Sequence, residues 1–266
     1  MKQLRIAVCV KRDLHGLTVL RQLIPLLSGH HVKVFCSVKT RPSETTDPVL
    51  AKIKHLERDF PMDILGSSAT HKEDDFLNQA DHPATWTALK NLKQGEGGQD
   101  LLDFAPDLVL SIRFSLIFKP WLIEQISLGI VNIHPGPLPK YRGLFTPFWQ
   151  YYNGEDALGC TVHLVDEGID TGPVLGFGTI ERQRDRSLLW AISTIYCAGL
   201  PIIADYVAAA AKGSSLSATP QKAGGNYYNF PTPSDFQSFQ TSVGEIVTPI
   251  DYSDMLARAW AGLGRN

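Results

Sequence analysis

The sequence has little of what builds disulfide-stapled, membrane-spanning or DNA-gripping proteins. Its four cysteines lie far apart inside apolar runs and form no Cys-x-x-Cys pair, so we expect buried, reduced thiols at Cys9, Cys36, Cys160 and Cys197. No apolar run reaches the roughly 20 residues of a membrane span, and the N-terminal apolar run is too short for a signal peptide. These absences favour a cytoplasmic protein that does not contact a membrane.

The chain also lacks a strong charge of either sign. Lysine and arginine number 25 against 27 aspartate and glutamate, which gives a formal net charge of -2. No broad cationic surface is indicated, and this disfavours nucleic acid as a partner. A length of 266 residues with 44% hydrophobic residues fits one large domain, or one domain with a modest extension.

Apolar runs that alternate with helical patterns predict an α/β fold with a mostly parallel central sheet. The predicted strands are 4–10, 31–38, 106–112, 129–134, 159–165 and 172–182. The first two strands flank a helix that starts near Leu14 and stops before Gly29. Strand, helix, strand at the start of a chain indicates a parallel crossover.

Further helices are predicted between these strands. Asp47 is a candidate N-cap with Pro48 at the first helical position, and another helix covers 146–153. A long apolar helical region runs from 187 to 213, with Pro201 as the expected break. The run "KQGEGGQD" (93–100) is interpreted as a flexible loop, and residues after Gly213 as an extended tail that adds a strand to the main body.

Ligands bind at the carboxyl ends of strands in parallel α/β sheets, and three features fall at such ends. They are "RFSLIF" after 106–112, "NIHPGPLPKYRG" after 129–133 and "VDEGIDTG" after 159–165. Asn132 and His134 alternate onto one face of the strand 129–134, and Asp170 follows the next strand. An amide donor beside a histidine with a carboxylate partner suits acyl transfer through an oxyanion. The chain has no Gly-x-Ser-x-Gly elbow, so the acyl group would pass directly to an acceptor.

Two segments resemble a known family. "VNIHPGPLPKYRG" (131–143) and "GCTVHLVDEGIDTGPVL" (159–175) are similar to the signature of the 10-formyltetrahydrofolate-dependent formyltransferases. That family includes glycinamide ribonucleotide transformylase, methionyl-tRNA formyltransferase and the sugar N-formyltransferases. The resemblance is sharp over 106–182 and extends in layout over 1–212. It implies a Rossmann-like catalytic domain over 1–212, with 213–266 as a C-terminal extension that packs on it.

The resemblance also implies a mechanism and a donor. Its Asn-His-Asp trio falls on Asn132, His134 and Asp170, which would be the catalytic residues. A neutral amine would attack the formyl carbon of 10-formyltetrahydrofolate, with Asn132 and His134 stabilising the oxyanion. Asp170 would hold His134 and help move the amine's proton towards the folate nitrogen that leaves.

Binding residues follow from the same resemblance. The pterin of the folate would lie against two segments, Leu116, Ile117 and Phe118 in the first, and Val165, Asp166, Glu167 and Gly168 in the second. The acceptor side would include Lys11, Arg12, Arg142, Phe145 and Thr146. No metal site is expected.

Several residues allow a purely structural interpretation. Arg142 either binds an acidic substrate or pins its loop, and Asp166 and Glu167 also shape their loop. His163 is interpreted as a satisfied structural histidine in an alternating strand. The Leu138-Pro139 bond is a candidate cis peptide because it lies in a tight turn.

The acceptor is predicted less sharply than the donor. The loop "CVKRDLHG" after the first strand lacks the glycines with which glycinamide ribonucleotide transformylase holds a phosphate, and the short tail has few cations for tRNA. We therefore expect a small amine as acceptor, such as a nucleotide-linked amino sugar or a secondary-metabolite amine. Alternatives are a formyltetrahydrofolate hydrolase, a methionyl-tRNA formyltransferase and a non-catalytic folate-binding protein. The aromatic-rich tail is compatible with a homodimer contact.

Overall fold

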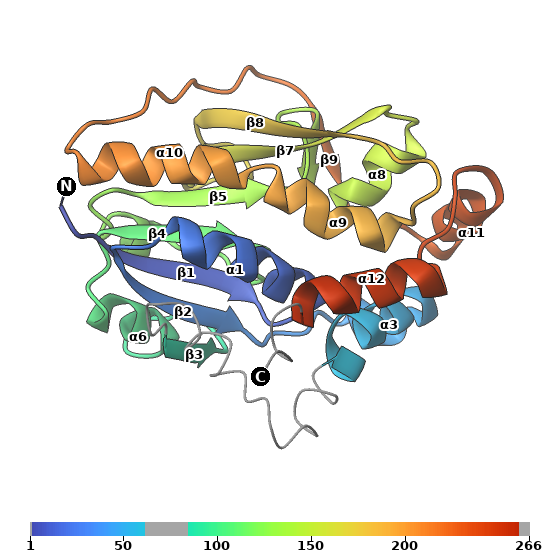
Figure 1. The fold of residues 1–266 in the computed structure, drawn as a ribbon, viewed down its shortest axis with the longest axis horizontal. Helices are drawn as coiled ribbons and strands as arrows, with labels where there is room; N and C mark the ends of the chain where they lie inside the picture. The colour runs from blue at the N-terminus through green and yellow to red at the C-terminus, as the bar shows by residue number, and fades with distance from the viewer. Residues whose placement is uncertain (1, 62–84, 261–266) are drawn as a thin grey trace. The chain divides into compact units, whose positions relative to one another are not determined.

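The computed structural model describes residues 2–61 and 85–260, drawn as a ribbon in Figure 1. The chain divides into two compact units. Unit 1 comprises Met1–Ile130 with Leu256–Asn266, and unit 2 comprises Val131–Met255. This division differs from the predicted boundary between residues 212 and 213, which stays a prediction.

Unit 1 contains a parallel sheet with the strand order β3-β2-β1-β4. Its strands are β1 (Arg5–Lys11), β2 (His31–Ser37), β3 (Thr85–Leu89) and β4 (Leu108–Ile112). In the register, Ile6 of β1 lies opposite Val32 on one side and Leu108 on the other. All residues of β4 are buried, as its unbroken apolar run predicts for a strand covered on both faces. Three of the four strands were predicted, and β3 was not.

The helices of unit 1 follow the predicted pattern in part. Among the described residues before Val131 they include α1 (Leu14–Leu26), α2 (Ser43–Thr46), α3 (Pro48–Lys54), the π-helix η1 (His55–Asp59), α6 (Gly97–Asp103) and α7 (Pro120–Ile123). Helix α1 connects the parallel strands β1 and β2 and is drawn beside β1 in Figure 1. The predicted cap of α3 is confirmed, because the Asp47 carboxylate accepts from the main-chain nitrogens of Val49 and Leu50.

The prediction of a flexible loop over 93–100 was wrong in its second half, where α6 begins at Gly97. Gly97 and Gly98 are buried, and a Cβ on Gly97 would lie 2.2 Å from the Asn91 carbonyl oxygen. These glycines therefore permit close backbone approach at a helix start. Composition alone suggested flexibility instead.

Unit 2 contains antiparallel strands and a small two-stranded sheet. Strand β5 (Ile130–His134) pairs with β7 (Ala157–Leu164), and β7 pairs with β8 (Val174–Glu181), both antiparallel. Strand β6 (Tyr141–Gly143) pairs in parallel with β9 (Asn226–Tyr228). Strand β9 is the strand that the tail was predicted to add.

The apolar region 187–213 forms two helices of unit 2, α9 (Leu188–Cys197) and α10 (Leu200–Ala211). The break falls at Ala198 and Gly199, and Pro201 occupies the second position of α10, where its missing N–H costs nothing. Both helices contact β8 (Figure 1). A Cβ on Gly178 of β8 would lie 2.3 Å from the Ala198 oxygen, so glycine permits this close packing.

By length and composition, the stretch Leu188–Ala211 also passes for a membrane-spanning helix, because it has 24 residues and contains a strongly apolar window. This corrects the expectation that no apolar run reaches that length. Within the fold 61% of the apolar window is buried. Core helices of globular proteins meet the same criterion.

The tail after Gly213 is more structured than predicted. After β9 it forms α11 (Pro233–Ser242) and α12 (Pro249–Trp260), so the prediction of a wholly extended tail was wrong. Helix α11 begins with a capping box, in which Thr232 and Asp235 bond each other's main-chain nitrogens. Its buried Phe236 and Phe239 pack against Phe148 of α8 (Thr146–Tyr152), with ring centroids 5.2 and 4.8 Å from that of Phe148.

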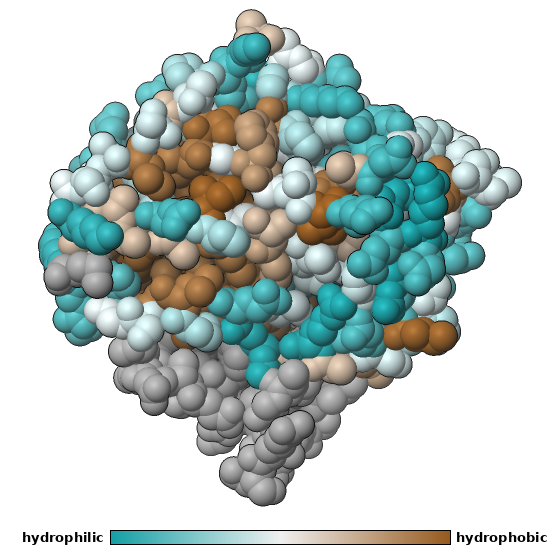
Figure 2. Space-filling view, turned by 45° about the horizontal axis from the view of Figure 1, so that its top comes forward, coloured by the Kyte–Doolittle hydropathy of each residue, from teal (hydrophilic) through white to brown (hydrophobic). Residues whose placement is uncertain are grey.

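In Figure 2, apolar side chains drawn in brown interrupt the polar surface in several places on the face in view.

The four cysteines are free, and Cys197 alone among them is partly exposed. Burial raises the pKa of the Cys160 thiol to about 12, which keeps it protonated and unreactive near neutral pH.

Candidate active site

The predicted trio lies at the end of β5 and in the loop after β7. Asn132 and His134 are on β5, and His134 is only 4% exposed. Asp170 lies in the loop that joins β7 and β8. The structure therefore brings together within unit 2 the three residues that the sequence nominated.

His134 is held through both ring nitrogens. Nε2 lies 2.5 Å from the main-chain oxygen of Tyr141, and Nδ1 lies 3.4 Å from Asp170 Oδ1. Both ring nitrogens thus face oxygens of the protein itself. Donation from His134 to a substrate oxyanion stays a prediction.

Asp170 has an unusual backbone and a fixed carboxylate. Its φ is +55°, in the left-handed region that non-glycine residues seldom adopt. Its Oδ2 accepts from the main-chain nitrogen of Gly143 at 2.9 Å, so Oδ1 is left to face His134. The carboxylate is thereby oriented from two sides.

Asn132 is oriented by His163, whose role the sequence did not reveal. The two residues are opposite each other in the β5–β7 pairing, and Asn132 Nδ2 lies 3.1 Å from His163 Nε2. His163 Nδ1 donates to the Leu164 oxygen at 2.8 Å. Burial lowers the pKa of His163, and the neighbouring His134 lowers it further. Neutral His163 therefore accepts at Nε2, which leaves the second hydrogen of the Asn132 amide for another acceptor.

The proline-rich loop after β5 is braced by Thr161 of β7. The Thr161 hydroxyl donates to the Gly136 oxygen at 2.8 Å and accepts from the Leu138 nitrogen at 2.9 Å. The Leu138-Pro139 bond is cis, as the sequence suggested. A Cβ on Gly136 would lie 2.8 Å from the Tyr141 oxygen, so the close turn requires glycine here.

The loop after β7 is shaped by its own side chains. Asp166 Oδ1 accepts from the Gly168 nitrogen at 3.1 Å and from the Thr171 hydroxyl at 2.7 Å. Asp166 therefore shapes the loop, as one interpretation of the sequence held. Contacts from Val165–Gly168 to folate stay a prediction.

The other segment predicted to bind folate belongs to unit 1. Leu116 and Phe118 are buried, whereas Ile117 between them is 59% exposed. Phe118 stacks on Phe114 with ring centroids 5.5 Å apart. Ile117 is therefore an exposed apolar side chain between two buried neighbours, Leu116 and Phe118.

The residues of unit 2 predicted to face the acceptor are engaged with the protein. The Arg142 guanidinium donates to the main-chain oxygens of Asp170 (3.3 Å) and Gly224 (3.0 Å), so it pins its loop. The hydroxyl of the fully buried Thr146 donates to the Pro135 oxygen at 2.8 Å. Phe145 precedes α8 and packs among aromatic rings, with its centroid 5.9 Å from that of Phe148. Substrate contact by these residues stays a prediction.

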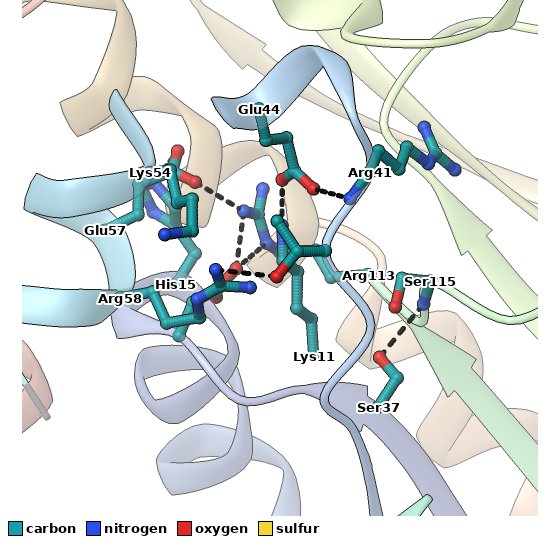
Figure 3. Close-up of polar contacts among 12 residues, drawn as sticks. Lys11, His15, Ser37, Arg41, Glu44, Lys54, Glu57, Arg58, Arg113 and Ser115 are labelled. Carbon is teal, nitrogen blue, oxygen red and sulfur yellow. Dashed lines mark hydrogen bonds and ion pairs between the residues drawn. The ribbon is translucent and has the colours of Figure 1, made fainter. Parts of the chain in front are cut away.

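Lys11 lies in a polar cluster of unit 1 (Figure 3). Its Nζ pairs with Glu44 Oε1 at 2.7 Å, and both side chains are less than 15% exposed. Burial by itself would raise the pKa of Glu44, but the charge of Lys11 and a hydrogen bond from the Arg41 nitrogen lower it overall. An anionic substrate at Lys11 would therefore compete with Glu44. Arg12, the next residue in the chain, is half-buried. Contact of Arg12 with the substrate stays a prediction.

The same cluster contains a buried network of charges centred on Arg113, which has a φ of +56° (Figure 3). Arg113 Nη2 pairs with Asp13 Oδ2 at 2.7 Å and with Glu57 Oε2 at 3.0 Å. Glu57 Oε1 also lies 3.0 Å from His15 Nε2. Burial would raise the pKa of Glu57, but Arg113 and His15 lower it well below its usual range. Asp13 meanwhile caps α1 by accepting from the Gly16 nitrogen, so a carboxylate of the chain itself occupies this helix start.

Within residues 2–61 and 85–260, no group of three or more His, Cys, Asp or Glu side chains is placed to hold a metal ion.

Comparison with known proteins identifies the family. A family model described as formyl transferase matches residues 51–181, which include β5, β7 and Asp170. The methionyl-tRNA formyltransferase of Kosmotoga olearia is 34% identical over 96 residues, which is 36% of this chain and 31% of that protein. Residues 51–181 of the chain therefore belong to the formyl transferase family.

Solved structures show the fold. A 4-N formyltransferase from Francisella tularensis superposes with a TM-score of 0.57 at 20% identity, covering 96% of this chain and 87% of that one. The sugar 3N-formyl transferase WlaRD, solved with dTDP and 5-N-formyl-THF, gives a TM-score of 0.52 at 18% identity, covering 86% and 70%. The predicted α/β formyltransferase fold is confirmed. The chain spans less than a third of the length of the curated sequence relatives that it matches.

Proposed function

We propose that this protein is an N-formyltransferase that transfers the formyl group of 10-formyltetrahydrofolate to a primary amine of a small molecule. The observation that carries the proposal is the arrangement of Asn132, His134 and Asp170 in unit 2. The Asn132 amide is oriented by a neutral His163 and keeps one hydrogen for a substrate oxygen. Two residues along β5, the His134 ring lies against the Asp170 carboxylate, with Nδ1 3.4 Å from Oδ1.

The trio can carry out direct transfer. The amine nitrogen attacks the formyl carbon, and the electron pair of the carbonyl moves onto oxygen, where Asn132 donates its remaining hydrogen. One such preorganised donor contributes about 3–4 kcal/mol to lowering the barrier. Asp170 accepts the proton that the amine loses, directly or through water, and the folate nitrogen receives it as the carbon–nitrogen bond to the donor breaks. The products are a formamide and tetrahydrofolate.

The donor is supported by likeness and by surface chemistry. The structure of WlaRD was solved with a formylated folate. In this chain, exposed Ile117 offers apolar surface of the kind on which flat heteroaromatic rings pack. The segments Leu116–Phe118 and Val165–Gly168 are the proposed contacts to the pterin.

A small acceptor is supported by similar evidence. Two of the structural relatives are described as a 4-N formyltransferase and a sugar 3N-formyl transferase. The net charge of -2 does not favour a tRNA. We therefore choose dTDP-linked 3-amino and 4-amino sugars as first probes. Lys11, Arg12, Arg142, Phe145 and Thr146 are the proposed acceptor-side residues.

The test is a turnover assay of the full chain with 10-formyltetrahydrofolate. Parallel reactions contain each amino sugar, methionyl initiator tRNA or no amine, and tetrahydrofolate, formate and formylated product are measured. Formylated sugar supports the proposal. Formate without an amine, formyl-methionyl-tRNA, or donor binding without turnover would overturn it in favour of a hydrolase, a tRNA enzyme or a folate-binding protein, respectively.

A further inference from the structure

Gln221, in the C-terminal extension, binds the loop that carries Asp170. Its Nε2 donates to the main-chain oxygens of Asp170 at 3.0 Å and Gly172 at 2.8 Å. Its Oε1 accepts from Arg142 Nη2 at 3.2 Å. Both amide hydrogens are thus directed at the loop, and the bond from Arg142 fixes which end of the amide faces it.

We propose that Gln221 is a positioning residue for Asp170, and that the C-terminal extension therefore completes the active site. The inference rests on the proposed function, in which the Asp170 carboxylate accepts a proton. It assigns a role to a segment that neither the sequence motifs nor the matched family segment includes, because that match ends at residue 181.

The backbone of Asp170 explains why such support is needed. A left-handed conformation at a non-glycine residue costs on the order of 1 kcal/mol or more, and it persists only where surrounding contacts hold it. At Asp170, bonds from Gln221 and Arg142 converge on the main-chain oxygen, while the Gly143 nitrogen holds Oδ2. Loss of the Gln221 bonds would let the peptide relax and turn the carboxylate away from His134.

Gln221 is itself placed by fixed points on either side of it in the chain. Thr219 exchanges two main-chain hydrogen bonds of 2.8 Å with Val174, at the start of β8. Strand β9 pairs with β6, and Arg142 donates to the Gly224 oxygen. A Cβ on Gly225 would lie only 1.8 Å from the Pro139 oxygen, which shows how closely the extension follows the proline-rich loop. The extension is therefore anchored on β8 and β6 and spans the Asp170 loop between them.

The experiment compares Gln221→Ala and Gln221→Glu with Gln240→Ala, an exposed glutamine of α11. Glutamate keeps the acceptor for Arg142 but loses both donors to the Asp170 loop. Steady-state constants are measured with 10-formyltetrahydrofolate and a dTDP-linked 4-amino sugar, and thermal midpoints confirm folding. Each Gln221 change is then repeated in an Asp170→Asn background, under single-turnover conditions with enzyme in excess.

Both Gln221 variants should lose roughly 10- to 100-fold in kcat with little change in KM, as expected for a reacting group displaced by about 1 Å. Gln240→Ala should match the wild type. In the Asp170→Asn background the further loss should be less than about twofold, because the two changes act through one group. Where Gln221→Ala does not fold, Gln221→Glu carries the same comparison.

Three results would overturn the inference. They are an unchanged kcat in the Gln221 variants, a raised KM with unchanged kcat, and an equal loss in both backgrounds, which a merely structural role produces. If the wild type itself turns over none of the amines, the proposed function fails instead. The two failures are therefore distinguishable.

Discussion

The strand ends of the two units carry polar clusters of contrasting design. In unit 1, Arg113 is matched by Asp13 and Glu57 at 2.7 and 3.0 Å, and all three side chains are largely buried. In unit 2, His134 Nδ1 and Asp170 Oδ1 are 3.4 Å apart, and Asn132 keeps an amide hydrogen beyond its bond to His163. In the first cluster the charged groups pair with one another within the protein. In the proposed function the second cluster presents donors to a substrate, so changes in the two clusters should affect different quantities.

The largest effect should follow from Asp170→Asn, which keeps the shape of the side chain and removes the proton acceptor. We expect kcat to fall about 10³-fold, within the range for general acid–base groups, while the free energy of unfolding changes little. Steady-state kinetics and urea denaturation measure the two quantities. Asp156→Asn, at an 84% exposed side chain, is the control. Turnover close to that of the wild type would remove Asp170 from the mechanism.

The opposite pattern is expected for Glu57→Ala in unit 1. The change leaves the buried Arg113 with one carboxylate fewer and His15 Nε2 without its partner. Breaking a buried ion pair costs about 3–5 kcal/mol in the free energy of unfolding, whereas kcat of the folded protein should stay unchanged. Urea denaturation and active-site titration separate the two. If stability held while kcat dropped, the cluster would belong to the catalytic machinery.

A smaller catalytic effect is expected when Asn132 loses its orienting partner. His163→Leu should lower kcat roughly 10- to 100-fold, less than deletion of the oxyanion donor itself. His163→Gln should retain more activity, because an amide oxygen can still accept from Asn132. Steady-state kinetics at neutral pH test this ranking. Equal activity in the Leu variant and the wild type would return His163 to a purely structural role.

The smallest effect concerns pH. The folded state lowers the pKa of His163, so the unfolded chain binds its proton more readily. The contribution of His163 to stability is therefore complete above about pH 6.5 and is lost as the pH falls below that value. Urea denaturation at about pH 7.5 and about pH 5.5 should show a smaller difference for His163→Gln than for the wild type. An identical pH dependence would contradict the buried neutral histidine.

The positions of Asn132, His134 and Asp170 at neighbouring strand ends were predictable because their signals are local, whereas their catalytic roles stay a prediction. Asn132 and His134 alternate on one strand, and Asp170 lies in a compact Asp-x-Gly-x-Asp loop, so no tertiary information was needed. The apolar strands were likewise visible as runs covered on both faces. The strand β3 and the helix α6 were missed, the latter because buried glycines at a helix start look like a loop.

Positioning residues could not be predicted in this way. The contact between His163 and Asn132 depends on the register of an antiparallel pair, which the sequence does not specify. Gln221 lies in a polar tail far from Asp170 in sequence, and only the folded extension brings them together. The start of α11, by contrast, has a signal in the sequence that the prediction of an extended tail missed. Thr232-Pro-Ser-Asp235 has the spacing of a capping box.

The most direct test of the central claim follows the formyl carbon itself. The full chain is incubated with 10-formyltetrahydrofolate labelled with ¹³C in the formyl group and a dTDP-linked 4-amino sugar, and the products are identified by NMR. With the wild type, we expect the label to appear in a formamide on the sugar nitrogen, and with Asp170→Asn we expect it to appear there far more slowly. Label that appears only in formate, or appears in the formamide equally fast with Asp170→Asn, would contradict it.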